Sequence, residues 1–258
     1  MKSPIKYPGG KSWLVPLFED IFAQHRDKRL VEPFCGSCAI GLGLGVDIAL
    51  MNDINPHLIN MFNQIKNGLM ICLSSSDNNE QIYYEKRQLF NDNIKENIID
   101  TPEMAELFYY LNRTGFNGMC RFNKSGFYNI PFGRYNKINY ATDFRMYGQL
   151  FENWEFTSGS FDQVALSDND FLYIDPPYVD TFSHYASTDF LWENHEKLAK
   201  WIEQFNGPVV VSNSSTDKTI SLYKSIGLEI DLVDVKRLIA ANSNNRGKVK
   251  EILAYKNI

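Results

Sequence analysis

The sequence predicts an α/β protein built on a mostly parallel sheet with helices on both faces. Segments of strand and helix character alternate along much of the chain of 258 residues. Short apolar runs such as residues 171–174 fit strands that are buried on both faces. Between residues 112 and 140 the apolar periodicity is poor, so we expect that region to belong to an insertion into the sheet.

Each element follows from its local pattern. Residues 29–34 form a first strand, and the small residues 35–41 turn into a helix. Residues 47–53 form a second strand that ends in an acid, and the asparagines and serines at 74–79 mark a loop. Further strands are predicted at 154–158, 171–175, 208–213, 228–235 and 251–256. Helices are predicted at 11–23, 55–67, 78–96, 102–112, 192–205 and 215–226.

The chain therefore divides into an α/β core in two parts, residues 1–60 and 151–258, with an insert at 61–150. The insert changes character at Asn112, after which glycine, asparagine, arginine and aromatic residues predominate. Residues 124–126 lie between two aromatic stretches and predict the turn of a hairpin.

Composition excludes several classes of protein. The chain is 44% hydrophobic and 22% charged, as in ordinary globular proteins. It has no apolar run of roughly 18 residues, and its first residues lack the apolar stretch of a signal peptide, so we expect a cytoplasmic protein. Cys35 and Cys38 form a CxxC, but no second pair of cysteines or histidines completes a metal site. We expect no metal and reduced structural thiols, with a redox CxxC as the alternative.

The distribution of charge favours a nucleic-acid partner, although the net charge of −5 does not. Residues 112–150 contain six basic residues and one aspartate, a net charge of +5, so the remainder carries −10. A local basic segment in an acidic protein is typical of a surface that binds phosphates. A solvated basic face is the alternative.

The most informative motif is Asp175-Pro176-Pro177-Tyr178, which follows the strand at 171–174. Open α/β sheets bind their ligands at the carboxyl ends of such strands. Prolines have no N–H, so the Pro176 carbonyl is free to accept a hydrogen bond, and Asp175 supplies a second acceptor. Two acceptors and the Tyr178 ring suit a planar heterocycle with an exocyclic amino group. A structural Pro-Pro loop is the alternative.

A nucleotide-like cofactor would fit the first strand and its helix. The turn at 35–41 lets the backbone approach a ligand, and Asp53 ends the next strand, where an acid usually accepts hydrogen bonds from ribose hydroxyls. The turn is not a full GxGxxG, and no Walker A sequence is present, which argues against an NTPase. The glycine turn at 6–11 is either a helix entry or a lid with Lys11 paired to an anion. Phe161 either stacks on a base or packs in the core.

Together these motifs resemble the Dam-type family of DNA adenine-N6 methyltransferases in the α arrangement. In that arrangement the cofactor motif comes first, the target-recognition segment next and DPPY last. The similarity runs from Lys6 to about Tyr255. Its strongest parts are YPGGK at 7–11, EPFCG at 32–36, Asn52-Asp53, NRTGFNGMCRFN at 112–123, YNIPFGRY at 128–135, DPPY, and NSNNRG at 242–247 followed by Glu251.

The resemblance implies a Rossmann-like, seven-stranded methyltransferase sheet whose final hairpin strand runs antiparallel, with a helical and hairpin DNA target-recognition insert. It also implies S-adenosylmethionine as the cofactor. The cofactor-binding residues would be Tyr7, Lys11, Phe34, Gly36, Asp53, Phe161 and Asp175. Two positions depart from the family pattern. Cys38 stands where many relatives have glycine, and Ser160 replaces an aspartate that is common before the phenylalanine.

The same resemblance assigns recognition of double-stranded DNA, with GATC as the suggested target, to residues 112–140. Arg121 would read a guanine with two hydrogen bonds. Asn117 would contact the thymine left unpaired by base flipping, and Met119 would wedge into the base stack. Phosphates would be held by Arg113 and Arg134, and the hairpin would be shaped by Pro131 and Tyr135.

The implied catalytic residues are Asp175, Pro176 and Tyr178. Hydrogen bonds from the adenine amino group to the Asp175 carboxylate and the Pro176 carbonyl would stabilise the positive charge that develops on nitrogen. The base must leave the duplex to react, and Tyr178 would stack on it. A cytosine-C5 enzyme would need a cysteine nucleophile, usually after proline, and none of the four cysteines follows a proline. The alternatives are a methyltransferase of RNA or of a protein amide, and a catalytically silent DNA-binding relative.

Overall fold

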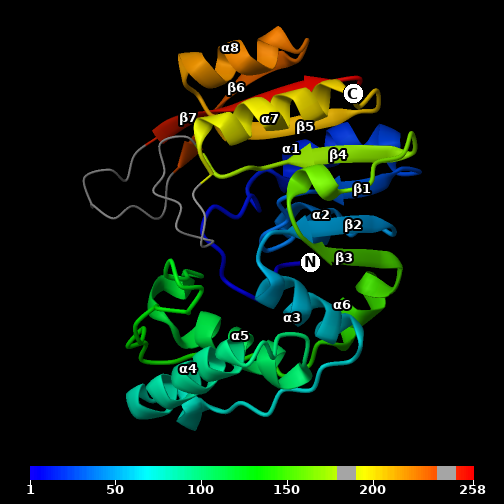
Figure 1. Cartoon of the computed structure of the whole chain (residues 1–258). Helices are drawn as coiled ribbons and strands as arrows, with labels where there is room; N and C mark the ends of the chain where they lie inside the picture. Colours follow the sequence, from blue (N-terminus) through cyan, green and yellow to red (C-terminus); the bar gives the residue numbers. More distant parts are fainter. Residues whose placement is uncertain (179–189, 237–247) are drawn as a thin grey trace.

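The computed structural model describes residues 1–178, 190–236 and 248–258, and its strands form one seven-stranded sheet (Figure 1). The order is β3-β2-β1-β4-β5-β7-β6, and neighbouring strands are parallel except where they pair with β7. The strands are β1 (Arg29–Glu32), β2 (Ala49–Asp53), β3 (Trp154–Ser158), β4 (Asp170–Ile174), β5 (Val209–Ser214), β6 (Glu229–Lys236) and β7 (Lys248–Lys256). The predicted Rossmann-like sheet with an antiparallel last strand is therefore confirmed.

Helices cover both faces of this sheet. On one face lie α1 (Val15–Phe22), α2 (Ala39–Leu44) and α3 (Pro56–Lys66), and on the other lie α7 (Trp192–Glu203) and α8 (Asp217–Ser225). Each face has its own hydrophobic core. Successive residues of a strand point to opposite faces, so Leu30 packs in the core under α1, α2 and α3, and Val31 packs in the core under α7 and α8. The helix predicted at 11–23 begins only at Val15, because residues 12–14 form a turn.

The chain leaves the sheet after β2 and returns at β3, as Figure 1 shows. Between them lie α4 (Glu80–Lys95), α5 (Pro102–Thr114) and α6 (Arg145–Leu150). α4 packs on α5, and α5 packs on α3, so α3 joins this helical region to the sheet. α6 was missed by the sequence analysis, because a helix of six residues is too short to show a period. The domain boundaries at residues 60 and 150 stay a prediction.

Residues after α5 form an irregular hairpin that α4 supports. Its turn is closed by a hydrogen bond from Asn123 N to Phe127 O of 2.8 Å, which confirms the turn predicted at 124–126. Tyr83 of α4 donates its hydroxyl to Ile130 O at 2.9 Å. A Cβ on Gly133 would lie 2.6 Å from Thr114 O, so the close return of the chain onto α5 requires glycine.

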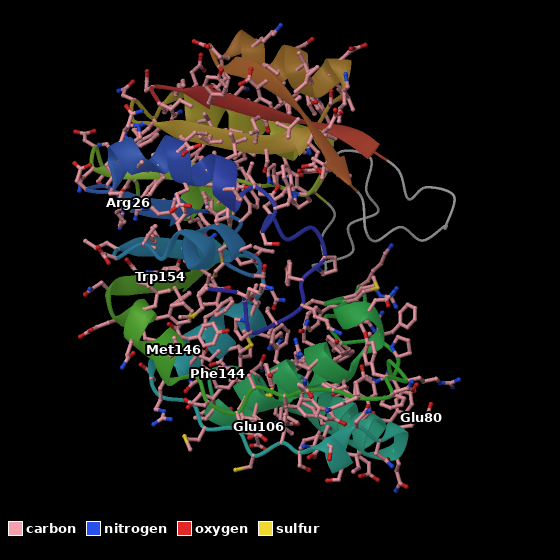
Figure 2. All side chains as sticks on the ribbon, turned by 180° about the vertical axis from the view of Figure 1, so that it is seen from behind. Arg26, Glu80, Glu106, Phe144, Met146 and Trp154 are labelled. Carbon is pink, nitrogen blue, oxygen red and sulfur yellow. The ribbon has the colours of Figure 1, made fainter. Side chains whose placement is uncertain are left out.

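Trp154 begins β3 at one edge of the sheet, and its side chain is buried (Figure 2). Its indole N–H donates to Val46 O at 2.9 Å. The charged side chains of Arg26 and Glu80, also labelled in Figure 2, are exposed.

The motif at 242–247 lies outside the described residues. Within the described ranges, no helix is long and apolar enough to cross a membrane.

Candidate active site

A cavity of about 210 Å³ opens at the carboxyl ends of β1, β2 and β4. The strand order reverses between β1 and β4, and open α/β sheets bind ligands at such a point. The lining comes from residues 7–11, 32, 34–37, 39–40, 53–54, 173 and 175–178. The YPGGK, EPFCG and DPPY motifs therefore border one space, together with Asp53.

The turn after β1 brings backbone close to the cavity. Gly36 has a φ of +46°, and a Cβ there would lie 3.1 Å from the ring of Tyr7. Cys38 has a φ of 52°, in the left-handed region that favours glycine. Its side chain is buried and does not line the cavity. The departure from the family pattern at Cys38 therefore affects the backbone rather than the space for a ligand.

Asp53 ends β2 with its carboxylate at the cavity wall. One oxygen accepts from Gly36 N at 3.0 Å and the other from Asn55 N at 2.9 Å. Burial raises the pKa of Asp53 to about 6, and these two hydrogen bonds oppose the rise. Each carboxylate oxygen has two lone pairs, so Asp53 can also accept hydrogen bonds from ribose hydroxyls.

Phe161 lies behind the cavity wall rather than in it. Its ring centroid is 5.4 Å from that of Phe34, and Phe34 lines the cavity. Ser160 also stands outside the lining, with its hydroxyl bonded to Asp162. Aromatic walls from Tyr7 and Phe34, the Asp53 carboxylate and the close backbone at Gly36 are features that fit the nucleoside part of S-adenosylmethionine.

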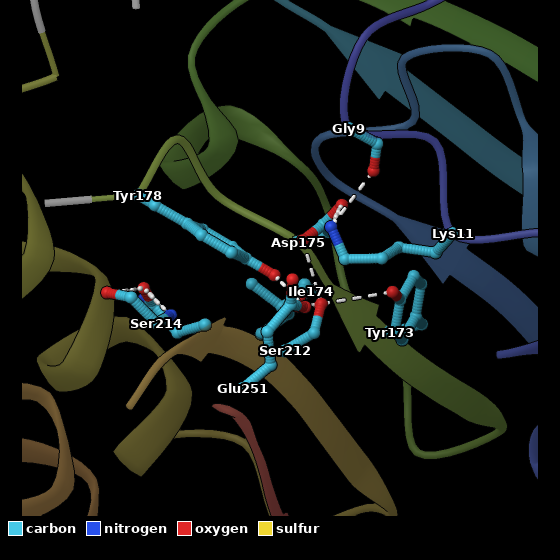
Figure 3. Close-up of polar contacts among 10 residues, drawn as sticks. Gly9, Lys11, Tyr173, Ile174, Asp175, Tyr178, Ser212, Ser214 and Glu251 are labelled. Atoms are coloured by element: carbon cyan, nitrogen blue, oxygen red, sulfur yellow. Dashed lines mark hydrogen bonds and ion pairs between the residues drawn. The ribbon is translucent and has the colours of Figure 1, made fainter. Parts of the chain in front are cut away.

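Asp175 is held through both of its carboxylate oxygens (Figure 3). Lys11 Nζ donates to Oδ2 at 2.9 Å, and the Ser212 hydroxyl donates to Oδ1 at 2.8 Å. The Tyr173 hydroxyl lies 3.0 Å from the Ser212 hydroxyl. Ser212 was missed by the sequence analysis, although a serine that directly follows the apolar run 209–211 of the neighbouring strand was a usable signal.

The residues predicted to bind DNA lie on α5 and the segment that follows it. Arg121 donates Nε to Asn129 Oδ1 at 2.8 Å, which holds the guanidinium against the facing strand of the hairpin. Arg113 donates to Asn139 O at 3.1 Å. Arg134 lies 3.6 Å from Glu80, with 79% of its side chain exposed. These arginines thus belong to α5 and the irregular segment after it, a part of the chain that Figure 1 shows between β2 and β3.

Two neighbours in this segment differ in exposure. Met119 is half-buried and packs against the hydrophobic core, whereas Phe116 is 48% exposed. Asn117 is exposed with a φ of 54°. Pro131 accepts a hydrogen bond from Phe116 N at 2.9 Å through its carbonyl. Phe116, an exposed aromatic side chain of this segment, was not singled out from the sequence.

Asn112 connects this segment to the cavity. Its side chain bonds Lys6 N at 3.0 Å, Lys6 O at 2.7 Å and Gly118 O at 3.2 Å, and it is fully buried. Lys6 directly precedes the cavity residue Tyr7, so one buried amide ties the glycine turn to the exposed residues around Asn117. From the sequence, Asn112 was only the first residue of the segment expected to recognise DNA.

Comparison with known proteins agrees with this arrangement of motifs. The family described as D12 class N6 adenine-specific DNA methyltransferase matches residues 7–239. The Retron Ec67 DNA adenine methylase of Escherichia coli is 36% identical over 238 residues, which cover 88% of this chain and 82% of that protein. A DNA adenine methylase of Vibrio cholerae is 32% identical over 97% of this chain and 94% of its own. That of Escherichia coli K12 is 34% identical over 97% of this chain and 93% of its own.

Proposed function

Because this chain belongs to the D12 class N6 adenine-specific DNA methyltransferase family, we propose that it methylates N6 of an adenine in duplex DNA with S-adenosylmethionine as the methyl donor. The observation that carries the proposal is the shared cavity. Asp175 and Tyr178 of DPPY border the same space as Gly36 and Asp53. The groups suited to a target base and those suited to a nucleoside cofactor therefore lie within reach of each other.

S-adenosylmethionine, when bound, supplies a methyl group on a sulfonium that is already a good leaving group. Tyr7, Phe34, Gly36 and Asp53 are the residues that would hold it. The protein's own task is then to orient the base. Asp175 accepts a hydrogen bond from the adenine amino group and stabilises the positive charge that develops on nitrogen.

The proposal extends to base flipping and to the GATC sequence. N6 of adenine is inside the duplex, so the base must leave the stack to reach the cavity, where the Tyr178 ring supplies a stacking surface. The similarity of residues 112–135 to the Dam-type recognition segment supports GATC. The hydrogen bond from Arg121 Nε to Asn129 leaves the terminal guanidinium nitrogens to donate to a guanine, which supports the proposed contact.

The test is expression in cells whose own DNA lacks adenine methylation, followed by methylation-sensitive sequencing. The expected result is N6-methyladenine at GATC. Methylated adenine at another sequence would overturn the GATC assignment alone. Unmodified DNA, with transfer of labelled methyl groups to RNA or protein pools in vitro, would overturn DNA as the substrate. Binding of S-adenosylmethionine without transfer to any pool would indicate a silent relative.

A further inference from the structure

We propose that Glu251 is a positioning residue for Tyr178, which fixes the tyrosine ring and makes its face more electron-rich for the target base. This inference rests on the proposed function. The Tyr178 hydroxyl donates to Glu251 Oε2 at 2.6 Å (Figure 3). Glu251 is 7% exposed. A glutamate from the last strand thus contacts the tyrosine of the catalytic corner, 73 residues earlier in the chain.

The backbone of Glu251 is held on both sides. Glu251 lies in β7, where it pairs with Ser214 of β5 and with Val233 of β6. Ser214 is the last residue of β5, so Glu251 stands at the sheet edge where the parallel strands end. Insertion of β7 between β5 and β6 therefore brings a carboxylate to the same edge as the DPPY motif.

The two prolines of DPPY restrict the main chain before Tyr178, and Glu251 restrains the tip of its ring. A hydrogen bond from a phenol to a carboxylate is short and strong because the acceptor carries charge. Burial raises the pKa of Tyr178 well above its ordinary value, so the proton stays on the phenol. The ring is then restrained at both ends before a base arrives.

Donation of this proton toward a carboxylate also increases the electron density of the ring. The adenine becomes positively charged as the methyl group arrives, and an electron-rich aromatic face attracts positive charge. The attraction is greater for the transition state than for the neutral bound base, so it should raise kcat more than it lowers KM. The ring already interacts with a cation, since Lys11 Nζ lies 4.8 Å from its centroid.

The test is a double-mutant cycle on duplex DNA with the full chain. Glu251→Gln should lower kcat roughly tenfold, because it replaces a charged acceptor by a neutral one of the same shape. Tyr178→Phe should lower kcat by a similar factor, and adding Glu251→Gln to it should cause no further loss. KM should change less than kcat. The control Glu229→Gln, an exposed glutamate on neighbouring β6, should leave kcat unchanged.

An equal loss from Glu251→Gln with and without Tyr178→Phe would overturn the inference, because Glu251 would then act through another contact. Wild-type kcat in Glu251→Gln would overturn it too. If Glu251→Gln fails to fold, Tyr178→Phe tests the inference by itself. A wild-type kcat in Tyr178→Phe would overturn it, because the hydrogen bond between Tyr178 and Glu251 would then contribute nothing to kcat. In all cases a wild-type chain that does not methylate adenine would overturn the proposed function instead.

A spectroscopic readout separates positioning from a loss of folded protein. 2-Aminopurine at the target position is quenched when it stacks on tyrosine, so its fluorescence in the DNA complex should rise in Glu251→Gln. The fluorescence should stay at the wild-type level in Glu229→Gln. Unchanged fluorescence in Glu251→Gln, together with an unchanged kcat, would contradict a role in holding the ring.

Discussion

The ammonium group of Lys11 lies 2.9 Å from Asp175 Oδ2, with only 7% and 19% of the two side chains exposed. The sequence predicted Lys11 as a cofactor residue and Asp175 as a residue that borders both cofactor and target. Both residues line the cavity, and their ion pair joins the YPGGK turn to the DPPY motif. An adenine amino group at Asp175 would meet a carboxylate that already accepts from Lys11 and Ser212, so we expect entry of the base and the position of the turn to be coupled.

Asp175→Ala should reduce methyl transfer by at least about 10²–10³, because a preorganised acceptor is lost. DNA binding should persist, since the predicted DNA contacts lie on the helical region. The variant should also melt at a lower temperature, because it leaves the buried Lys11 ammonium without its carboxylate partner. Methyl-transfer assays, gel shifts and thermal melting measure the three effects.

Lys11→Met added to Asp175→Ala is the matched control. It removes the unpaired buried charge, so it should restore the melting temperature without restoring turnover. Near-normal turnover in Asp175→Ala would remove this residue from the mechanism.

Asp53→Ala should weaken S-adenosylmethionine binding more than Phe161→Ala does. Asp53 lines the cavity, whereas Phe161 acts only through the Phe34 ring in front of it. Calorimetric titration of the cofactor measures both affinities, and DNA affinity should change in neither variant. A larger loss in Phe161→Ala would show that this ring reaches the ligand directly.

Arg121→Ala should relax discrimination at one guanine, at a cost of about 1–3 kcal/mol for a bidentate base contact. Arg134→Ala should weaken binding to all sequences alike and flatten the salt dependence, because a phosphate contact carries no base information. Methylation of GATC and its single-base variants at two salt concentrations separates the two roles. The opposite pattern would show that they are exchanged.

Glu80→Gln is a control for the role of Arg134. The carboxylate of Glu80 lies 3.6 Å from Arg134 and competes with a phosphate for it. Its removal should strengthen DNA binding slightly in the wild type and have no such effect in Arg134→Ala. Equal effects in both backgrounds would mean that Glu80 repels DNA independently of Arg134.

Phe116→Ala should impair base flipping more than Met119→Ala. The Phe116 ring is 48% exposed, whereas Met119 packs against the core, so only Phe116 can enter a base stack without repacking. Fluorescence of 2-aminopurine at the target adenine reports flipping, and thermal melting should show the larger loss of stability in Met119→Ala. Normal flipping in Phe116→Ala would indicate that Met119, and not Phe116, is the residue that wedges into the base stack.

Glu32→Gln should stabilise the protein at high pH. Burial raises the pKa of Glu32 to about 8, against about 4.3 in an unfolded chain. The folded state therefore favours protonated Glu32, and this stability is full below about pH 4 and is lost as the pH rises through 8. Glutamine keeps an acceptor for Gly41 N without the charge.

The melting temperature of Glu32→Gln should exceed that of the wild type by roughly 5 °C at pH 9 and match it at pH 4. The control Glu103→Gln changes an exposed glutamate and should have no such pH dependence. A constant difference at all pH values would mean that the charge of Glu32 is not the cause.

Local patterns in the sequence predicted most of the secondary structure and the motifs that border the cavity. The strands at 171–174 and 154–158 and the helices from 55, 78 and 102 follow from apolar runs and period, and the structure places them within a few residues. The DPPY and EPFCG motifs could be assigned to one site, since the ends of parallel strands meet at one edge of the sheet. YPGGK follows no strand and was assigned there only through the family resemblance.

Only the tertiary structure decided which side chains complete that site. Ser212 reaches Asp175, and Glu251 reaches Tyr178, because β5 lies beside β4 and β7 is inserted between β5 and β6. Strand order and register bring together residues that are far apart in the chain, and a local pattern contains no information about either. The packing of the Phe161 ring against Phe34 likewise joins residues that are far apart in the chain, so only the tertiary structure shows it.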